Sequence, residues 1–381
     1  MPASTRWLVA ALVLVLASAG FFALSRWLHT EPVPSRAGGG FDLTGVLDEL
    51  SDDSFERPMG AWRLGLPLDH GAHPNARTET WNISAQLRDD VGEDIGIQFA
   101  LLRVGLVSPD AAERASPWEL RALYRAHVTL LDAAQDAAAG EERFHRDVPG
   151  VAGHDAARRE VWLDNWTIQY GEGNRGDQLR LDATVGEMAL GLLFTPAKAA
   201  VALNPDGASA PFRGYSITRM VAVGFIGAGV DRRSLSGLAW LDHVWGDVPL
   251  PLGPIVSDRL QLQLDDGTDL LVTRTRRRDG GGTPTLGGYA VDPHGGMEPL
   301  ASASLKMEAT RTWRDAVGAS FPLDWRLRAG ELQLNVAPIA DDQVHEFAVP
   351  LWSGIVTVKG VLRDRRVSGL GTLLLTGDAI R

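Results

Sequence analysis

The sequence contains no cysteine and only four tyrosines, and its acidic residues outnumber its basic ones. The lack of cysteine excludes disulfide bonds, thiolate metal sites, a cysteine nucleophile and lipid attachment at an N-terminal cysteine. With 48 acidic against 37 basic residues the formal net charge is −11. This charge argues against nucleic acid as a partner, because nucleic-acid-binding domains carry a basic patch. A chain of 381 residues can bury a sizeable core without disulfides.

One long apolar run lies near the N-terminus. Arg6 precedes it, the run covers Leu8 to Leu16, and the small residues Ala17-Ser18-Ala19 follow at the spacing that a signal peptidase recognises. Apolar residues continue to Leu24, so residues 1–24 are predicted to be either a signal peptide or an uncleaved signal anchor. Both alternatives predict a periplasmic or otherwise extracytoplasmic protein, secreted or associated with the membrane through its N-terminus. Residues 25–60 are predicted to form a linker, because the segment from Glu31 to Gly40 contains two prolines and three consecutive glycines.

Two common catalytic signatures are also missing, namely a glycine-rich phosphate-binding loop and a Gly-x-Ser-x-Gly nucleophile elbow. From about residue 160 onward the sequence shows period-two alternation interrupted by turn residues, which is typical of short antiparallel strands. Residues 259–264 alternate, turn at Asp265-Asp266-Gly267 and continue through 270–273, and this pattern predicts a β-hairpin. The same pattern recurs at 179–184, 188–194, 331–336, 355–361 and 370–376. These repeats predict an all-β chain of barrels or sandwiches.

One segment has a different pattern. Ser116-Pro117-Trp118-Glu119 is typical of a helix start, and the residues up to Ala139 are rich in Ala, Leu, Arg and Glu. Local periodicity alone therefore favours a helix in this segment.

The first group of residues that could carry chemistry is Asp69-His70-Gly71-Ala72-His73-Pro74. Two histidines beside an aspartate could bind a metal or act as acid and base. Gly71 and Pro74 make this segment a loop, however, so the three side chains need not converge. The alternatives are a lining role in a pocket and a rigid turn, and both are favoured over a metal site.

The second group is Trp240-Leu241-Asp242-His243-Val244-Trp245. On a strand, Trp240 and Asp242 share one face, and His243 and Trp245 share the other. A carboxyl group among apolar side chains should have a raised pKa, which would make Asp242 a proton donor. The alternative is that Asp242 accepts hydrogen bonds from backbone or indole N–H groups and has a structural role.

The third group is Tyr215-Ser216-Ile217-Thr218-Arg219, in which Tyr215, Ile217 and Arg219 would share a face of a strand. Such an arginine most often pairs with a carboxylate, and this interpretation is favoured here.

In this order, these motifs resemble the AttH-like family, which includes bacterial carotenoid 1,2-hydratases, also called hydroxyneurosporene synthases. The resemblance covers roughly residues 60 to 378. It also includes Glu79 with Trp81, 126–132, 162–166, 237–246, 262–267, Arg278-Asp279-Gly280, Pro322 with Trp325, Trp352 with Gly354, and Leu375-Thr376-Gly377.

The resemblance implies two tandem lipocalin-like β-barrels, at residues 61–250 and 251–381, and no cofactor. It also implies that residues 126–132 form a strand, and we follow it over the helical periodicity because tertiary context overrides propensity. Three positions where the family pattern has glutamate are neutral in this chain, at Val244, Ser353 and Leu374.

Two functions are compatible with these features. The first is a hydratase-like or hydrolase-like enzyme for an apolar lipid or isoprenoid substrate, with Asp242 protonating an alkene and no metal. The second is a non-catalytic lipid carrier or an accessory protein of a membrane transporter, which the missing carboxylates favour. The predicted catalytic residues are Asp242, His70 and His73, and the predicted ligand-binding residues are Trp81, Tyr215, Trp240, Trp245 and Arg219.

Overall fold

The computed structural model describes residues 55–109, 119–133, 137–173, 176–207, 211–247 and 255–377. The predicted signal peptide or anchor, and most of the predicted linker, lie outside these ranges. Within the described ranges, none of the helical structure has the length and apolar character that crossing a membrane requires.

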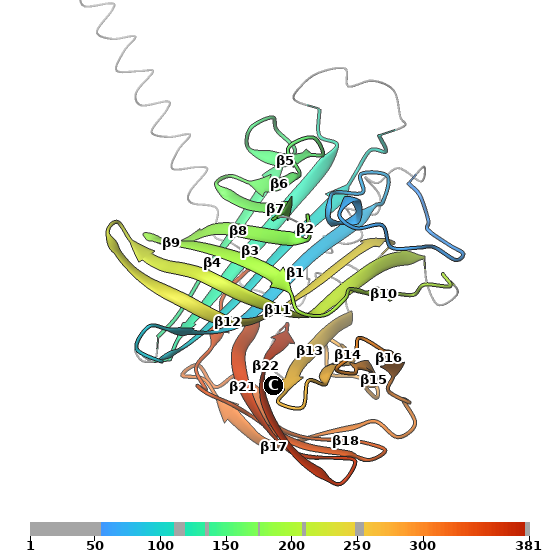
Figure 1. The fold of residues 1–381 in the computed structure, drawn as a ribbon, viewed down its shortest axis with the longest axis vertical. Helices are drawn as coiled ribbons and strands as arrows, with labels where there is room; N and C mark the ends of the chain where they lie inside the picture. Colours follow the sequence, from blue (N-terminus) through green and yellow to red (C-terminus); the bar gives the residue numbers. More distant parts are fainter. Residues whose placement is uncertain are drawn as a thin grey trace, which may run out of the picture. The chain divides into compact units, whose positions relative to one another are not determined.

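The first sheet contains twelve strands, and eleven of them follow the order β4-β3-β2-β1-β12-β11-β9-β8-β7-β6-β5, with β10 paired to β11 (Figure 1). The strands are β1 (Thr78–Asp89), β2 (Asp94–Gly105), β3 (Ala122–Asp132), β4 (Ala137–Arg146), β5 (Ala152–Asp155), β6 (Glu160–Leu163), β7 (Trp166–Glu172), β8 (Gln178–Val185), β9 (Met188–Pro196), β10 (Val201–Leu203), β11 (Phe212–Ala228) and β12 (Asp231–Gly246). Every pairing is antiparallel, and the sheet curves into a nearly closed barrel.

Alternation explains why these segments form strands with one face inside the barrel. In β8 the odd-numbered residues from Leu179 to Val185 are buried and the intervening ones are partly exposed. The segment with helical periodicity forms β3, in which Ala126, Val128 and Leu130 join the barrel core. The strand implied by the family resemblance is therefore confirmed, because packing against β2 and β4 outweighs local propensity.

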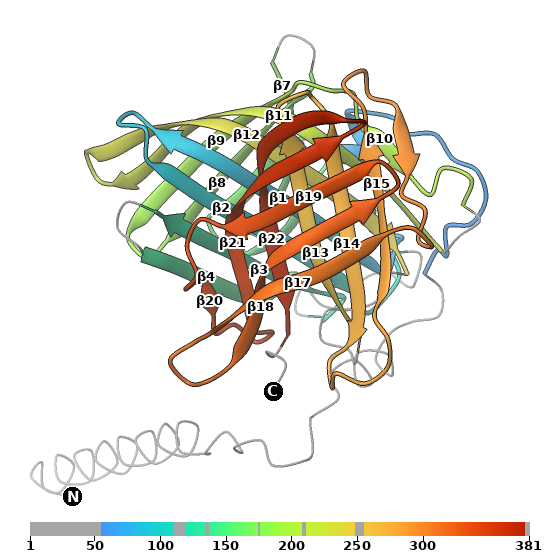
Figure 2. The same cartoon turned by 90° about the horizontal axis from the view of Figure 1, so that it is seen from below.

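The second sheet contains ten strands in the order β16-β15-β14-β13-β22-β21-β19-β18-β17, with β20 paired to β21 (Figure 2). The strands are β13 (Ile255–Leu264), β14 (Asp269–Arg277), β15 (Thr285–Val291), β16 (Met297–Pro299), β17 (Lys306–Arg314), β18 (Ser320–Ala329), β19 (Leu332–Pro338), β20 (Val344–His345), β21 (Leu351–Leu362) and β22 (Arg365–Thr376). This sheet is a half-barrel with its own apolar core. The predicted hairpin is present, and its turn places Gly267 at a φ of +86°, a value that favours glycine.

The two sheets are in contact through the outer face of β1, β2, β3, β11 and β12. Ser84 Oγ donates to Gln261 Oε1 at 2.6 Å, and Thr129 Oγ1 donates to Ser353 Oγ at 3.1 Å. The first barrel therefore has two chemically different faces, an enclosed interior and an outer face covered by the second sheet. The predicted all-β, lipocalin-like fold is confirmed.

Candidate functional site

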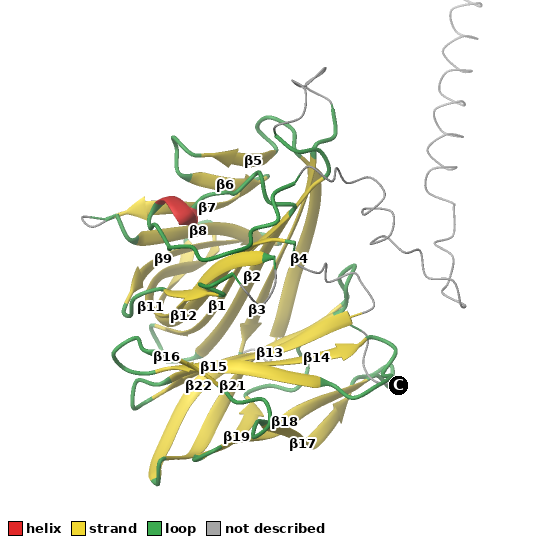
Figure 3. Cartoon of the chain, turned by 90° about the vertical axis from the view of Figure 1, so that its right-hand side faces the viewer, coloured by secondary structure: helices red, strands yellow, loops and turns green. Residues whose placement is uncertain are grey.

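The loop that precedes β1 brings His70 into the barrel. It contains η1 (Leu68–His70), the only helical turn of the described residues (Figure 3). His70 is buried, and its Nδ1 lies 2.5 Å from the Tyr215 hydroxyl on β11. Gly71 is required next to it, because a Cβ there would lie 2.4 Å from the Tyr170 hydroxyl. The loop can therefore pack His70 closely against two phenols.

The environment fixes where the proton lies in the His70–Tyr215 pair. Burial and, to a smaller extent, the neighbouring His243 lower the pKa of His70 to about 3, although the charge of Asp69 acts in the opposite direction. Burial raises the pKa of Tyr215 well above its usual value, and the charges of Asp69 and Glu79 add to this effect. At neutral pH the imidazole is neutral and the phenol is protonated, so the Tyr215 O–H donates to His70 Nδ1.

A second cluster is centred on Glu79, a fully buried residue of β1. Its Oε1 accepts hydrogen bonds from His73 Nδ1 at 2.8 Å and from His243 Nε2 at 2.9 Å. The backbone N–H of His73 also donates to this carboxylate, at 2.9 Å to Oε2. The second ring nitrogen of His73, Nε2, lies 3.6 Å from Asp69 Oδ1. His73 is thus held between two carboxylates.

These contacts give the three groups different charges. Burial works against the charge of His73, but hydrogen bonds and charges from Asp69 and Glu79 outweigh it and raise the pKa of His73 to about 9. Burial also opposes the charge of Glu79, and its bonds to His243 and His73 overcome this and lower its pKa to about 2. Burial lowers the pKa of His243. At neutral pH His73 is therefore an imidazolium beside a buried carboxylate.

Aromatic rings enclose both clusters. The His73 ring stacks on Trp245 with centroids 3.8 Å apart, and the His243 ring stacks on Trp81 at 4.5 Å. Trp81 Nε1 donates to the His70 carbonyl at 3.2 Å. The structure thus brings together five of the eight predicted site residues inside the first barrel, namely His70, His73, Trp81, Tyr215 and Trp245.

A metal ion is the cofactor for which this geometry offers ligands. One atom each from His73, Glu79 and His243 can be chosen so that the three atoms lie within 4.8 Å of one another, a set that zinc and iron bind. In the structure both imidazoles donate to the same carboxylate oxygen, so hydrogen bonds alone account for this proximity.

Asp242 and Trp240 lie elsewhere, on the outer face of β12. Asp242 Oδ1 accepts from Trp240 Nε1 at 2.9 Å and from the Ser216 hydroxyl, and Oδ2 accepts from Gln261 Nε2 at 2.8 Å and from the Arg259 guanidinium. Trp240 packs against apolar residues of the second sheet. The prediction that apolar side chains surround Asp242 is therefore wrong. The carboxylate is an ion-pair partner between the sheets, and the strand separates it from His70 and His73.

Arg219 also faces the second sheet, where its Nη2 pairs with Asp269 at 2.6 Å. The predicted pairing with a carboxylate is present. The prediction that Tyr215, Ile217 and Arg219 share a face is wrong, because the pairing of β11 with β12 shifts between Ile217 and Met220. This bulge returns Met220 to the barrel core and turns Arg219 outward.

Two central residues, Glu79 and His243, were absent from the predicted site. Alternation along the strands could have indicated both residues, because Glu79 shares a face with Trp81 and His243 shares a face with Trp245. What joins them is the pairing of β1 with β12, in which Trp81 lies opposite His243. No local pattern specifies that pairing.

Comparison with known proteins identifies the family of this chain. Residues 57–378 match the model of the AttH-like family. The chain belongs to the AttH-like family. No curated protein matches the sequence.

The crystal structures that resemble this AttH-like chain include two with TM-scores of 0.60 or more. One is a protein from Nitrosomonas europaea assigned as AttH, with a TM-score of 0.70 and 24% identity over 83% of this chain and 97% of the other. The second is kievitone hydratase from Nectria haematococca, with a TM-score of 0.60 and 15% identity over 86% of this chain and 98% of the other. At these identities the likeness concerns the fold.

At three positions the AttH-like pattern has glutamate and this chain has a neutral residue, and all three positions lie away from the histidine clusters. Alternation along β12 directs Val244 to the outer face, opposite to His243 and Trp245. Leu374 lines a cavity of about 330 Å³ between the two sheets, together with Arg259. Ser353 bonds to Thr129 across the same contact. The changes therefore alter the contact between the sheets and leave the barrel interior unaffected.

Proposed function

We propose that this AttH-like protein is a hydratase or dehydratase for an apolar small molecule of lipid or isoprenoid type, and that the reaction needs no cofactor. The observation that carries the proposal is the contrast between His70 and His73, which are three residues apart in one loop. The first is neutral, with a pKa lowered to about 3, and the second is a cation, with a pKa raised to about 9. Neighbouring titratable groups whose pKa values are pushed apart are typical of acid–base sites.

The two pairs suit the two halves of a hydration. Water bound at the Tyr215 oxygen can give up a proton as the Tyr215 proton passes to His70 Nδ1, along the 2.5 Å hydrogen bond. The water oxygen then bonds to one carbon of the double bond. The proton returns through the same phenol to the neighbouring carbon, so the site ends as it began. The His73 imidazolium stabilises negative charge that develops on the substrate.

The pKa values of His70 and His73 also limit the kind of double bond that can react. A base with a pKa of about 3 and an acid with a pKa of about 9 are both weak, although both are in the required protonation state at neutral pH. They disfavour protonation of an isolated alkene. They suit a double bond conjugated with a carbonyl group, because the imidazolium can then stabilise an enolate oxygen. Asp242 receives no part, since four donors already fill its oxygens.

The test is addition of water to a panel of apolar unsaturated carbonyl compounds in water enriched in heavy oxygen, with the product detected by mass spectrometry. Tyr215→Phe should lower turnover roughly 10²–10⁴-fold, the usual contribution of a proton-transfer group. Tyr289→Phe is the matched control, because Tyr289 is also buried but its hydroxyl bonds to Ser216 on the outer face. Equal turnover of Tyr215→Phe and the unmodified protein would contradict the proposal.

A lipid carrier is the second candidate. The observation that favours it is the complete burial of Glu79, Tyr215 and His243, which leaves few polar atoms accessible to a reacting ligand. Native mass spectrometry of protein isolated from its source distinguishes the two candidates. A carrier retains its ligand without chemical change on incubation, whereas a hydratase converts it to the hydrated or dehydrated product.

The proposed place of action is outside the cytoplasm, supported by Arg6, the apolar run and Ala17-Ser18-Ala19. Fractionation of cells that produce the full chain tests it. The protein should occur in the periplasmic or membrane fraction, and its N-terminal sequence then decides between cleavage after Ala19 and retention as an anchor, which would keep it near a membrane transporter.

A further inference from the structure

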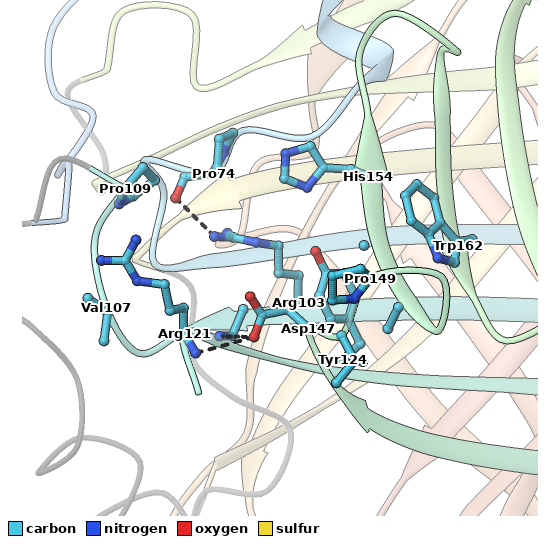
Figure 4. A pocket seen from close by; sticks show the side chains of 14 residues that line it. Pro74, Arg103, Val107, Pro109, Arg121, Tyr124, Asp147, Pro149, His154 and Trp162 are labelled. Carbon is cyan, nitrogen blue, oxygen red and sulfur yellow. Dashed lines mark hydrogen bonds between the residues drawn. The ribbon is translucent and has the colours of Figure 1, made fainter. Parts of the chain in front are cut away.

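A cavity of about 590 Å³ lies at one end of the first barrel and is separate from the two histidine clusters. Figure 4 shows Pro74, His154 and Trp162 around it, with the Arg103 side chain between them. A volume of this size accommodates a small organic molecule. Pro74 directly follows His73, so the loop that carries the catalytic candidates also forms a wall of the cavity.

Arg103 is a buried cation in the wall of this cavity. Its side chain is 4% exposed, and Nη1 and Nη2 donate to the carbonyls of Ala76 and Pro74 at 3.0 Å each. Its contacts within the described ranges include no carboxylate within 4 Å. A buried charge is ordinarily paired with an opposite charge, because desolvation is costly. These two carbonyls, and the Tyr124 side chain that also hydrogen-bonds to Arg103, carry no net charge.

Much of the rest of the wall is apolar or neutral, and its other charged residues are the partly exposed Arg121 and Asp147. Val148, Pro149 and the Trp162 ring provide apolar surface. Burial lowers the pKa of His154, so this side chain is neutral at pH 7. The carboxylate of Asp147 also lines the cavity, and its Oδ1 accepts backbone N–H groups at 3.2 and 3.1 Å. Arg103 is therefore the buried cation of this wall, and a ligand anion could neutralise it.

We infer that this cavity binds a small organic anion with an apolar, flat body, and that its carboxylate or sulfonate pairs with Arg103 while its body packs on Trp162. The pairing of β1 with β2 places Arg103 directly opposite Glu79, on the same face of the sheet. A ligand held by Arg103 is therefore a neighbour of the Glu79–His73 cluster. The inference rests on the proposed function at one point only, where it takes the ligand of this cavity to be the substrate of the hydratase. At that point it names the substrate class.

Two fluorescent probes test the inference without any turnover. Anilinonaphthalene sulfonate carries the anionic group, and N-phenylnaphthylamine has the same aromatic body without it. The full-length protein should bind the sulfonate more tightly. Arg103→Met should weaken sulfonate binding roughly tenfold or more, since a hydrogen-bonded charge contributes about 1.5–3 kcal/mol. Binding of the uncharged probe should change less than about twofold, because that probe has no charge for Arg103 to pair with.

Two further variants keep the test decisive if Arg103→Met disturbs the loop that Arg103 holds. Arg103→Lys retains the charge and should bind the sulfonate nearly as the unmodified protein does. Ala152→Phe places a ring in the cavity, and both probes should then lose binding. Arg88→Gln is the control for loss of an arginine, because Arg88 is exposed and pairs with Asp94.

Equal weakening of both probes by Arg103→Met, or undiminished binding of both by Ala152→Phe, would overturn the inference. Tighter binding of the uncharged probe by the unmodified protein would do the same. These outcomes concern binding alone, so they are distinguishable from failure of the hydratase proposal, which depends on turnover and on Tyr215.

Discussion

Each of the two faces of β12 lies beside a buried carboxylate, and the two carboxylates differ in their partners. Inside the barrel, Glu79 accepts hydrogen bonds from the imidazoles of His73 and His243. Outside it, Asp242 accepts from the Arg259 guanidinium and from neutral side chains. Imidazoles exchange protons near neutral pH, whereas guanidinium, amide and indole groups do not. A reactive carboxylate is therefore not identified by its burial or by its complete hydrogen bonding. It is identified by partners that exchange protons near neutral pH.

The largest expected effect is on the outer face. Asp242→Ala should lower the free energy of unfolding by roughly 3–5 kcal/mol, because it leaves Arg259 and Gln261 without their acceptor. Urea denaturation followed by fluorescence measures this loss. The pKa of His73 should not move, since the strand separates the two groups.

The matched control is the double variant Asp242→Leu with Arg259→Met, which removes both charges. Replacing a buried ion pair with apolar residues is often close to neutral, so most of the lost stability should return. If Asp242→Ala shifts the titration of His73, the two faces are coupled and the comparison fails.

The next effect is the dependence of stability on pH. In the unfolded chain His73 loses its proton near pH 6.5, and in the folded chain it keeps it to about pH 9. Its stabilising contribution is therefore complete below pH 6.5 and is lost as the pH rises through 9, a decline of about 3 kcal/mol. Urea denaturation at several pH values measures it, and His73→Gln should abolish it.

His345→Gln is the control for this alkaline decline. Burial lowers the pKa of His345 to about 4, so its destabilising effect appears below pH 6.5 as the unfolded chain takes up a proton. The variant should improve stability in acid and leave the alkaline decline unchanged. An alkaline decline that persists in His73→Gln would show that another group causes it.

A smaller effect isolates the carboxylate inside the barrel. Glu79→Gln should lower the pKa of His73 by roughly one unit or more, because it removes one of the two negative charges that favour the imidazolium. Nitrogen NMR of labelled histidine measures the shift. Asp242→Asn is the matched variant outside the barrel, and equal shifts in the two variants would contradict the distinction between the faces.

The smallest effect concerns the stacked indole. Trp245→Leu should lower the pKa of His73 by about half a unit, since a cation over an aromatic ring gains about 0.5–1 kcal/mol. Trp62→Leu is the control, because Trp62 meets Trp245 edge-on at 5.5 Å. The same NMR titration serves both variants, and an unchanged pKa in Trp245→Leu would limit the role of the ring to packing.

Alternation in the sequence predicted strands from about residue 160 onward, the hairpin at Asp265-Asp266-Gly267 and the division of β12 into two faces. The AttH-like resemblance supplied β3, whose composition favours a helix. Alternation could not predict which face of β12 holds the titratable cluster, because that depends on the pairing that sets Trp81 opposite His243. The bulge after Ile217 was likewise invisible, since one extra residue reverses every later side chain without changing the composition.

The alternation of β12 also separates two kinds of change in an engineered protein. His243 and Trp245 can be varied to alter the barrel interior, while Trp240 and Asp242 on the intervening positions keep the second sheet attached. A library restricted to inward-facing positions should therefore retain folded members at a higher rate than one that includes the outward-facing positions. The strand acts as a wall whose two sides can be redesigned separately.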